Sequence, residues 1–594
     1  MTKQLLLVTT GSEPEIFKSD SRCLFLGDWC SVSGLQDIDS SSTVNTLRHP
    51  WESHENYERD YSRIDTKYKE MLRILSLILS EEHGVFESER YWQIILGSWL
   101  SRFVTAIFEH NLLISDVIVK YPKSQISYMA PKFDSNMAPT ATSDALLLLE
   151  SREFNALLYS ELLSVNKNSN ISLDGEYPLK SDIKKTIRPI RTTRKILSRL
   201  LDSTSKIVSF KNILVVPYLS YRDRFSISWK SKRFLLFSLP VDRDEKFSEI
   251  DSNRRDHLCK KAFAISKEKD KILISLMIKY LPKSFLECFQ FYASKAKNKT
   301  KGTPSVIING IGDILLESEV TRFWLAENVM KGAYLVTKQH GGVYGSAKFM
   351  MIEDMQRSNA DLFLSWGWSD MGVRAMPMRP QRPWLQPLVN SGRVTVVKVA
   401  FPLFFYHIFP SPQSAKFAAY IRSISNLCVD LDGRLDLDVN LRVYPQDYSW
   451  GVADVVKGLP VKVTSAPSTT LEEDCKSSAF AIIAYDATSH LNLLRHNYPT
   501  LFLFDEDYYQ PRLEIKSFFD ELEAVGVLHK SNESLISFLN GILPDVQSWW
   551  NSIATQSAIH RFRQSYLKQD DFFAEAWSAL LDDIEAEKSA HIQI

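Results

Sequence analysis

A histidine and two glycines follow a short apolar run in the middle of the chain. Residues 333–337 predict a buried strand, and Gln339, His340, Gly341 and Gly342 come shortly after it. Ligands of open α/β sheets bind beyond the carboxyl ends of the strands, where glycines let the backbone approach a ligand closely. A histidine can act there as a general base near neutral pH. This turn is therefore a candidate catalytic site, although a turn with a structural histidine has the same pattern.

A second turn with polar side chains follows the predicted buried strand at residues 480–484. Asp486, Thr488 and Ser489 stand where the next helix is expected to begin. Hydroxyls and free backbone N–H groups at a helix N-terminus bind anions such as phosphate. The alternative is an ordinary N-cap, in which one of these side chains only starts the helix.

Two further strand ends in the second half carry charged side chains. Arg442 and Asp447 follow one predicted strand, and Glu506 and Arg512 follow another. Because the carboxyl ends of parallel strands meet at one edge of a sheet, we expect these groups near Ser489. Two arginines that converge on a helix N-terminus repel each other unless an anion lies between them. The pattern predicts a diphosphate or nucleotide site, while a surface ion pair is the alternative for Arg442.

The common nucleotide and metal motifs are absent from the sequence. It has no GxxxxGKS/T segment and no GxGxxG after a strand, so it is neither a P-loop enzyme nor a standard dinucleotide-binding protein on motif grounds. The acidic triplet at residues 505–507 could hold Mg²⁺, but such triplets are common in solvated loops, and we predict no metal. The six cysteines form no CxxC pair, which indicates neither a zinc site nor a disulfide framework and fits a reducing cytoplasm.

The composition is that of a globular protein with more than one domain. The chain has 594 residues, too many for one ordinary core. Lys plus Arg equals Asp plus Glu at 71 each, which argues against a nucleic-acid-binding protein. The N-terminal residues lack the features of a signal peptide, and the longest apolar run, residues 394–409, is interrupted and short for a membrane span.

The order of predicted elements divides the chain near its middle. Four prolines within residues 376–390 predict a stiff linker. After it, strands alternate with helices, which indicates a parallel sheet. The first half adds long helical patterns at residues 57–82, 91–113 and 145–163. We predict an α/β fold with two Rossmann-like domains facing across a cleft: residues 1–385, enlarged by helical insertions, on the acceptor side, and residues 386–594 on the nucleotide-donor side.

Several longer stretches together resemble a known family. They are FLGDWC (25–30), YWQIILGSWL (91–100), QHGGVYG (339–345), LSWGWS (364–369), RVYPQDYSWG (442–451), YDATSHLNLL (485–494), PTLFLFDEDYYQPR (499–512) and SWWNSIATQ (548–556). In this order they resemble a family of bacterial transferases encoded among surface-polysaccharide genes, those of O-antigen and capsule. More distantly, the pattern is similar to GT-B glycosyltransferases, including the β-Kdo transferases of capsule synthesis and the CDP-glycerol glycerophosphotransferases.

The resemblance implies roles for both turns. His340 matches the His-Gly base of the glycerophosphotransferases, and Asp486, Thr488 and Ser489 match their turn on the donor phosphates. The candidate catalytic residues are His340, Gln339 and Asp447. The candidates for substrate or donor binding are Gly341, Gly342, Tyr344, Arg442, Asp486, Thr488, Ser489, Glu506 and Arg512.

The chain departs from these families in two places. Gln446 stands where the family usually has the histidine of YPHD, so no role carries over to that position. Gln339 and His340 stand where the capsule Kdo enzymes have an acidic residue, which puts a double-displacement mechanism in doubt.

These observations predict a metal-independent GT-B glycosyltransferase of surface-polysaccharide synthesis. Its co-substrate would be a nucleotide sugar, with a CMP-linked acidic sugar as one candidate, and its acceptor a glycan or lipid-linked glycan. We expect no other cofactor, no nucleic acid and a cytoplasmic location, with a peripheral place at the inner membrane as an option. The basic residues 184–199 are either solvated or a patch for an anionic acceptor or the membrane surface. Two alternatives stay open: a non-catalytic GT-B scaffold that binds a glycan or a partner, and a nucleotide-sugar epimerase.

Overall fold

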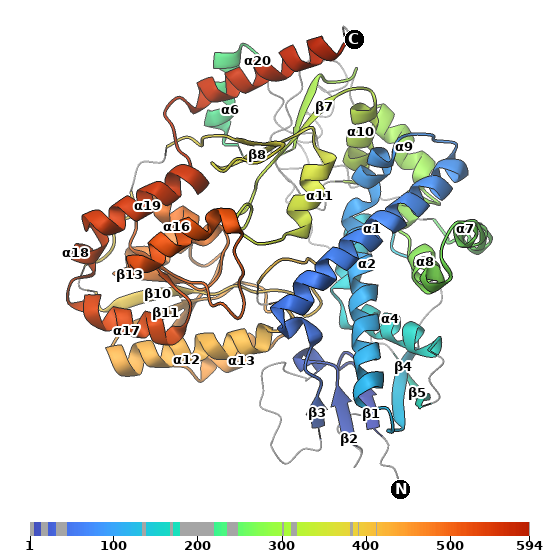
Figure 1. Cartoon of the computed structure of the whole chain (residues 1–594), viewed down its shortest axis with the longest axis horizontal. Coiled ribbons are helices and arrows are strands. Elements are labelled where there is room, and N and C mark those ends of the chain that lie inside the picture. Colours follow the sequence, from blue (N-terminus) through green and yellow to red (C-terminus); the bar gives the residue numbers. More distant parts are fainter. Residues whose placement is uncertain are drawn as a thin grey trace.

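Three parallel β-sheets organise the part of the chain that the structure describes (Figure 1). The computed structural model describes residues 5–13, 22–30, 44–132, 138–166, 170–178, 219–233, 248–299, 302–309, 318–380, 384–389, 391–411 and 413–592. The basic stretch at residues 184–199 lies outside the described residues. The predicted α/β class with Rossmann-like parallel sheets is confirmed, and the first half of the chain contributes two of these sheets.

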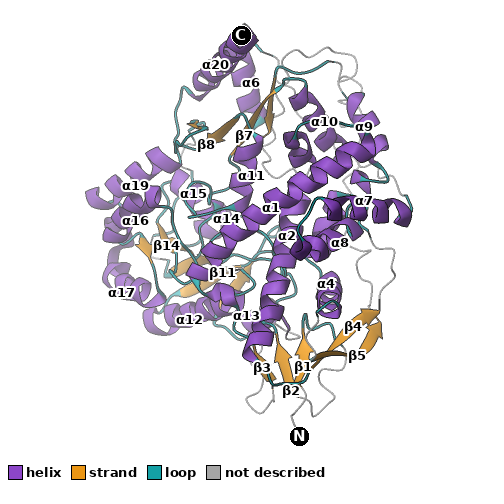
Figure 2. Cartoon of the chain, turned by 45° about the vertical axis from the view of Figure 1, so that its right-hand side comes forward, coloured by secondary structure: helices purple, strands orange, loops and turns teal. Residues whose placement is uncertain are grey.

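The first sheet lies at the N-terminal end of the molecule (Figure 2). Its strand order is β3-β2-β1-β4-β5, with every neighbouring pair parallel. The strands are β1 (Leu5–Val8), β2 (Arg22–Phe25), β3 (Val44–Thr46), β4 (Ile126–Lys132) and β5 (Ile171–Pro178). Most residues of β1 and β2 are buried, because crossover connections place helices against the faces of a parallel sheet.

Two long helices enlarge the first half, as the helical patterns predict. They are α1 (His54–His83) and α2 (Glu89–Lys120). Ser53 starts α1 by accepting a hydrogen bond from the Asn56 amide, and Gly84 ends it with a left-handed φ of 65°. Twenty-one of the 32 residues of α2 are buried, so its middle part lies inside the molecule rather than on its surface.

Further helices of the first half pack near this pair, except that α6 packs against the last helix of the chain. They are α3 (Thr142–Leu149), α4 (Arg152–Ser164), α6 (Tyr221–Ser231), α7 (Ser252–Ala264), α8 (Lys271–Lys279) and α9 (Phe289–Lys297). The prediction of one helix over residues 145–163 is wrong, because the chain breaks between α3 and α4. Ser151 starts α4 there by accepting a hydrogen bond from the Phe154 amide.

The second sheet carries the turn of Gln339, His340, Gly341 and Gly342, which we call the histidine turn. Its order is β6-β7-β8-β9, formed by β6 (Val306–Asn309), β7 (Tyr334–Lys338), β8 (Leu362–Ser365) and β9 (Val373–Ala375). The helices α10 (Glu319–Met330) and α11 (Met351–Asn359) connect its strands. The last helix, α20 (Phe573–Ile592), also packs on this sheet, with Trp577 and Leu580 in one apolar cluster with Val336 and Leu364. The end of the chain therefore returns to the first half.

The third sheet has the strand order of a doubly wound domain, β12-β11-β10-β13-β14-β15. Its strands are β10 (Arg393–Val397), β11 (Asp438–Arg442), β12 (Val461–Thr464), β13 (Phe480–Ile483), β14 (Thr500–Leu503) and β15 (Leu528–His529). The chain winds outward from β10 in one direction through β11 and β12, and in the other through β13, β14 and β15. The point between β10 and β13, where the order reverses, is where such sheets bind ligands.

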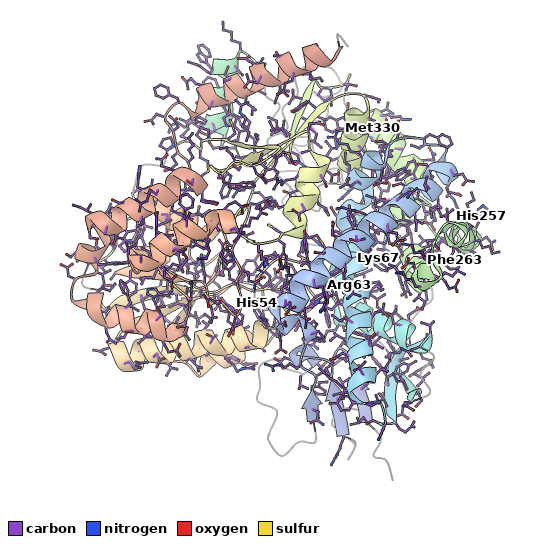
Figure 3. All side chains as sticks on the ribbon, viewed as in Figure 1. His54, Arg63, Lys67, His257, Phe263 and Met330 are labelled. Carbon is purple, nitrogen blue, oxygen red and sulfur yellow. The ribbon has the colours of Figure 1, made fainter. Side chains whose placement is uncertain are left out.

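Helices cover both faces of the third sheet. They are α12 (Phe417–Leu435), α13 (Val452–Lys457), α14 (Leu471–Lys476), α15 (Thr488–Arg495), α16 (Leu513–Ala524), α17 (Asn532–Ile542), α18 (Val546–Trp550) and α19 (Ile553–Tyr566). His54 at the start of α1 reaches this region, where its Nε2 lies 2.7 Å from the Glu506 carbonyl oxygen (Figure 3). Among the described helices, none combines the length and apolar character that crossing a membrane requires.

Candidate functional site

Gln339 fixes the histidine turn to the loop after β8. Its Oε1 accepts hydrogen bonds from the Trp366 amide and the Trp368 indole, both at 3.0 Å, and its Nε2 donates to the Gly341 carbonyl at 2.8 Å. Its side chain is buried. The amide that the sequence placed among the catalytic groups is thus occupied within the chain, and it positions His340 rather than presenting itself to a substrate.

His340 is half-buried and held by an aromatic neighbour. The Tyr344 hydroxyl lies 3.1 Å from its Nδ1, and the two rings meet edge to face at 5.0 Å. Tyr344 is itself buried and stacks on Phe363, so its contribution is to orient His340. His407 lies nearby, and burial, together with the charges of Arg102 and His340, lowers its pKa well below the usual value.

The histidine turn is in direct contact with the turn at residues 486–489, which follows β13 of the third sheet and which we call the polar turn. A Cβ on Gly342 would lie 1.7 Å from the Ala487 carbonyl oxygen, which no side chain could accommodate. A Cβ on Gly341 would lie 3.9 Å from the Thr488 hydroxyl. The glycines therefore allow the two turns to lie in close contact, whereas the sequence predicted a close approach of this backbone to a ligand.

Asp486 links the two turns through a hydrogen bond. Its Oδ2 accepts a hydrogen bond of 2.5 Å from the Ser346 hydroxyl, which belongs to the segment after the histidine turn. Burial raises the pKa of Asp486 to about 7. His490 Nε2 lies 3.6 Å from Oδ1, but burial lowers the pKa of His490 to about 3, so it is neutral and cannot balance a carboxylate charge.

The N-terminus of α15 has no side-chain cap. Its N-cap residue is Ala487, which has no hydrogen-bonding side chain, so its first N–H groups are available to another acceptor. Thr488 and Ser489 open the helix, and the Ser489 hydroxyl lies 2.8 Å from the Tyr485 hydroxyl. The ordinary N-cap that the sequence left open as an alternative is not what this helix has.

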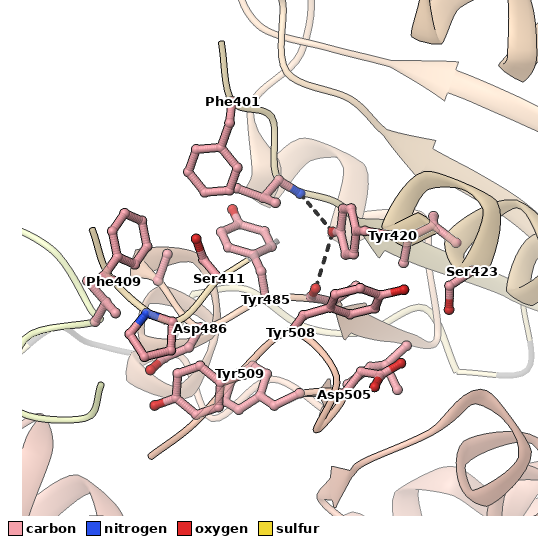
Figure 4. A pocket seen from close by; sticks show the side chains of 18 residues that line it. Phe401, Phe409, Ser411, Tyr420, Ser423, Tyr485, Asp486, Asp505, Tyr508 and Tyr509 are labelled. Atoms are coloured by element: carbon pink, nitrogen blue, oxygen red, sulfur yellow. Dashed lines mark hydrogen bonds between the residues drawn. The ribbon is translucent and has the colours of Figure 1, made fainter. Parts of the chain in front are cut away.

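A pocket of about 140 Å³ lies beside this helix end, at the carboxyl edge between β10, β13 and β14 (Figure 4). We call it the tyrosine pocket. Its aromatic walls are Phe401, Phe409, Tyr420, Tyr485, Tyr508 and Tyr509. The Tyr420 hydroxyl accepts from the Val399 amide at 3.1 Å and donates to the Ala484 carbonyl at 3.2 Å, which fixes that wall. The Ser411 hydroxyl is buried there without a hydrogen-bond partner.

The two arginines do not converge on this helix end. Arg442 donates to Asp474 at 2.5 Å and to the Thr469 carbonyl at 3.0 Å. Arg512 pairs with Glu353 at 2.8 Å and donates to the Ala347 carbonyl at 2.6 Å. Each guanidinium is thus bound by a carboxylate of the chain that is distant in sequence, whereas the sequence predicts that at least one of them reaches an anion at Ser489.

Comparison with known proteins gives the family. The sequence model of the LIC12162 family transferases matches residues 5–581. The chain belongs to this family. No curated protein matches it. Its structure aligns with that of a mutant O-GlcNAc transferase from Thermobaculum terrenum at 8% identity and a TM-score of 0.34, over 88% of this chain and 99% of that chain.

Two acidic candidates of this LIC12162 family transferase lie outside the tyrosine pocket. Asp447 accepts hydrogen bonds from the Gly451 and Val452 amides, both at 2.8 Å, and so caps α13. Glu506 is largely exposed and pairs with Lys530 at 3.2 Å. Its neighbour Asp505 lines the pocket instead.

The sequence did not single out Tyr420, His407 or Arg102. Tyr420 belongs to the apolar face of α12, so its spacing in the sequence is that of a core residue. A signal was nevertheless present for the pocket. Tyr508 and Tyr509 stand in the loop that follows β14, at the end of the strand where an α/β sheet places its ligand.

Asp486→Asn tests the buried carboxyl. The folded-state pKa lies above the ordinary 3.8, so the stability contributed by its proton is present at low pH and is lost as pH rises toward and through about 7. Asparagine keeps an acceptor for Ser346 without the charge. We expect the melting temperature of the wild type to fall more than that of the variant between about pH 5 and about pH 8. Equal pH dependence in the two proteins would show that Asp486 titrates normally.

Proposed function

We propose that this transferase is a GT-B glycosyltransferase of bacterial surface-polysaccharide synthesis. The observation that supports it is the tyrosine pocket at the switch point of a doubly wound sheet, bordered by an uncapped helix N-terminus and touched by the histidine turn. This arrangement offers a pocket for a planar nucleobase, a helix N-terminus for phosphates and, in His340, a proton acceptor.

The donor is a nucleotide sugar bound on the third sheet. The aromatic walls suit a nucleobase, since every base has a π-face that stacks on tyrosine. The free N–H groups of α15, with the hydroxyls of Thr488 and Ser489, suit the adjoining phosphate. A CMP-linked acidic sugar is the donor that we propose to test first. The helix N-terminus, rather than a metal ion, stabilises the leaving phosphate in this proposal.

His340 acts as the general base. It lies one residue from the glycines that contact the polar turn, at the edge of the second sheet. Its imidazole would accept the proton of an acceptor hydroxyl as that hydroxyl attacks the sugar carbon of the donor. A second pocket of about 20 Å³ shares Pro410, Ser411 and Tyr508 with the tyrosine pocket and extends to Trp51 and Tyr57 near the start of α1.

Nucleotide titration tests this proposal. We expect calorimetry to show binding of at least one of CMP, UDP and GDP, and Tyr508→Ala to weaken it about tenfold or more, because stacking on one aromatic ring contributes about 1–3 kcal/mol. Tyr121→Ala, which removes a tyrosine at the end of α2 outside both pockets, is the matched control and should bind normally.

The alternatives give different results in the same experiment. If no nucleotide binds even at millimolar concentration, the non-catalytic scaffold is favoured over the transferase. Conversion of a nucleotide sugar in the absence of any acceptor would identify an epimerase.

A further inference from the structure

Lys338 is a buried cation that forms no ion pair with any described residue. It is the last residue of β7, two positions before His340, and only 9% of it is exposed. Among the described residues, no hydrogen-bond acceptor and no carboxylate contacts its ammonium group, whose recorded neighbour is the face of Trp577 at 6.0 Å. Burial of such a group is costly unless something pairs with it, and burial lowers its pKa to about 8.

Two arginines stand near this lysine. Arg495 ends α15, and its Nε is buried without an acceptor. Arg563 of α19 donates to the Gln569 amide oxygen at 3.1 Å, which carries no charge. Hydrogen bonds bring two of these segments together: Gln339, next to Lys338, accepts from the Trp366 amide at 3.0 Å, and the Trp366 carbonyl accepts from the amide of Lys568, which precedes Gln569, the partner of Arg563. The charge of Arg495 also lowers the pKa of Lys338, and that of Arg563 lowers the pKa of Arg495, so the three cations act on one region. The dipole of α15 favours a cation at its C-terminus, which explains the position of Arg495 but not that of Lys338 or Arg563.

Two neutral donors in the same place also lack acceptors. The Trp366 indole N–H and the Gln569 Nε2 are both buried without a hydrogen-bond partner. They belong to one small region, because the Lys568 amide donates to the Trp366 carbonyl at 2.7 Å. Buried donors are normally satisfied, so their coincidence with three cations indicates an acceptor that the described part of the chain does not supply.

One carboxylate acts on this cluster, and it is already engaged. Asp223 of α6 raises the pKa of both Lys338 and Arg495. It also forms an ion pair with Arg379 and accepts from the Ser220 hydroxyl at 2.8 Å. Its single charge therefore balances Arg379, and the three cations remain in excess.

We infer that Lys338, Arg495 and Arg563, with the N–H groups of Trp366 and Gln569, bind a phosphate group. A phosphate offers several acceptor oxygens and the negative charge that this set lacks. The cluster adjoins the carboxyl end of β7 on the second sheet, whereas the tyrosine pocket lies on the third. Given the proposed glycosyltransferase function, on which this assignment of the ligand rests, the phosphate belongs to the acceptor and anchors it beside His340.

Lys338→Met tests the site with inorganic phosphate and inorganic diphosphate as probes, at constant ionic strength. We expect both anions to raise the melting temperature of the wild type and the variant to lose most of this effect, with diphosphate affinity about tenfold weaker or more. In the absence of anion the variant should melt higher than the wild type, because it no longer buries an unpaired charge. Lys516→Met, which removes an exposed lysine of α16, is the control and should respond like the wild type.

The outcomes separate this inference from the proposed function. Absence of phosphate and diphosphate binding, or a Lys338→Met protein that is less stable than the wild type without anion, would overturn the phosphate site while nucleotide binding by the tyrosine pocket could still be observed. Nucleotide binding should be the same in Lys338→Met and the wild type if the two sites are separate. A soluble prenyl diphosphate that binds more tightly than inorganic diphosphate would identify a lipid-linked acceptor, and equal binding a phosphate without lipid.

Discussion

Replacing His340 by alanine is expected to lower kcat by about 10²–10⁴-fold, the range that a positioned general base contributes. The loss should fall on kcat and not on nucleotide affinity, because His340 belongs to the second sheet and the nucleotide is expected on the third. Turnover would be measured with the donor that titration identifies, and nucleotide binding by calorimetry on the same preparation. Unchanged turnover of that substrate would remove His340 from the mechanism.

Tyr344→Phe is the matched control for this experiment. It removes only the hydroxyl that lies 3.1 Å from Nδ1 of His340 and keeps the ring that stacks on Phe363. We expect a smaller loss of kcat than in His340→Ala, together with a shifted pH–rate profile, because the imidazole loses a hydrogen-bond partner. A structural defect alone would reduce turnover without moving the profile.

The sequence predicted the elements of the site because its signals are local. Each turn is marked by residues that directly follow an apolar strand, and the carboxyl edge of a parallel sheet collects such turns. The contact between Gly342 and Ala487 follows from the same logic, since a close backbone approach needs a residue without a side chain.

The failure for the arginines has a physical reason. An arginine that pairs with a carboxylate of the chain is not available to a ligand, and that carboxylate can come from any part of the chain. Asp474 is 32 positions from Arg442 in the sequence, and Glu353 lies in the other half of the chain from Arg512. No local pattern shows either partner. The sequence also does not show whether Tyr420 lies in the core or in a pocket wall, because the 3.6-residue period of an apolar helix face is the same in both cases.

The ion pair of Glu353 with Arg512 is expected to have the largest effect on stability. Glu353 is fully buried on α11, accepts the Gly345 amide at 2.9 Å, and pairs with Arg512 at 2.8 Å. Arg512 in turn donates its amide to the Ser346 carbonyl at 2.8 Å. The pair therefore holds the segment after the histidine turn against the third-sheet loop that carries Arg512.

Glu353→Gln keeps the size of the side chain and removes its charge, which takes away the carboxylate that pairs with the mostly buried Arg512 at 2.8 Å and with Arg357 at 3.3 Å. We expect the free energy of unfolding to fall by about 3–5 kcal/mol, the cost of removing one partner of a buried pair. Denaturant unfolding would measure it, with Asp520→Asn as the control because that carboxylate pairs with Lys516 on the surface. An exposed pair contributes about 1 kcal/mol or less, so equal losses in the two variants would mean that the Glu353 pair does not hold the two halves of the site together.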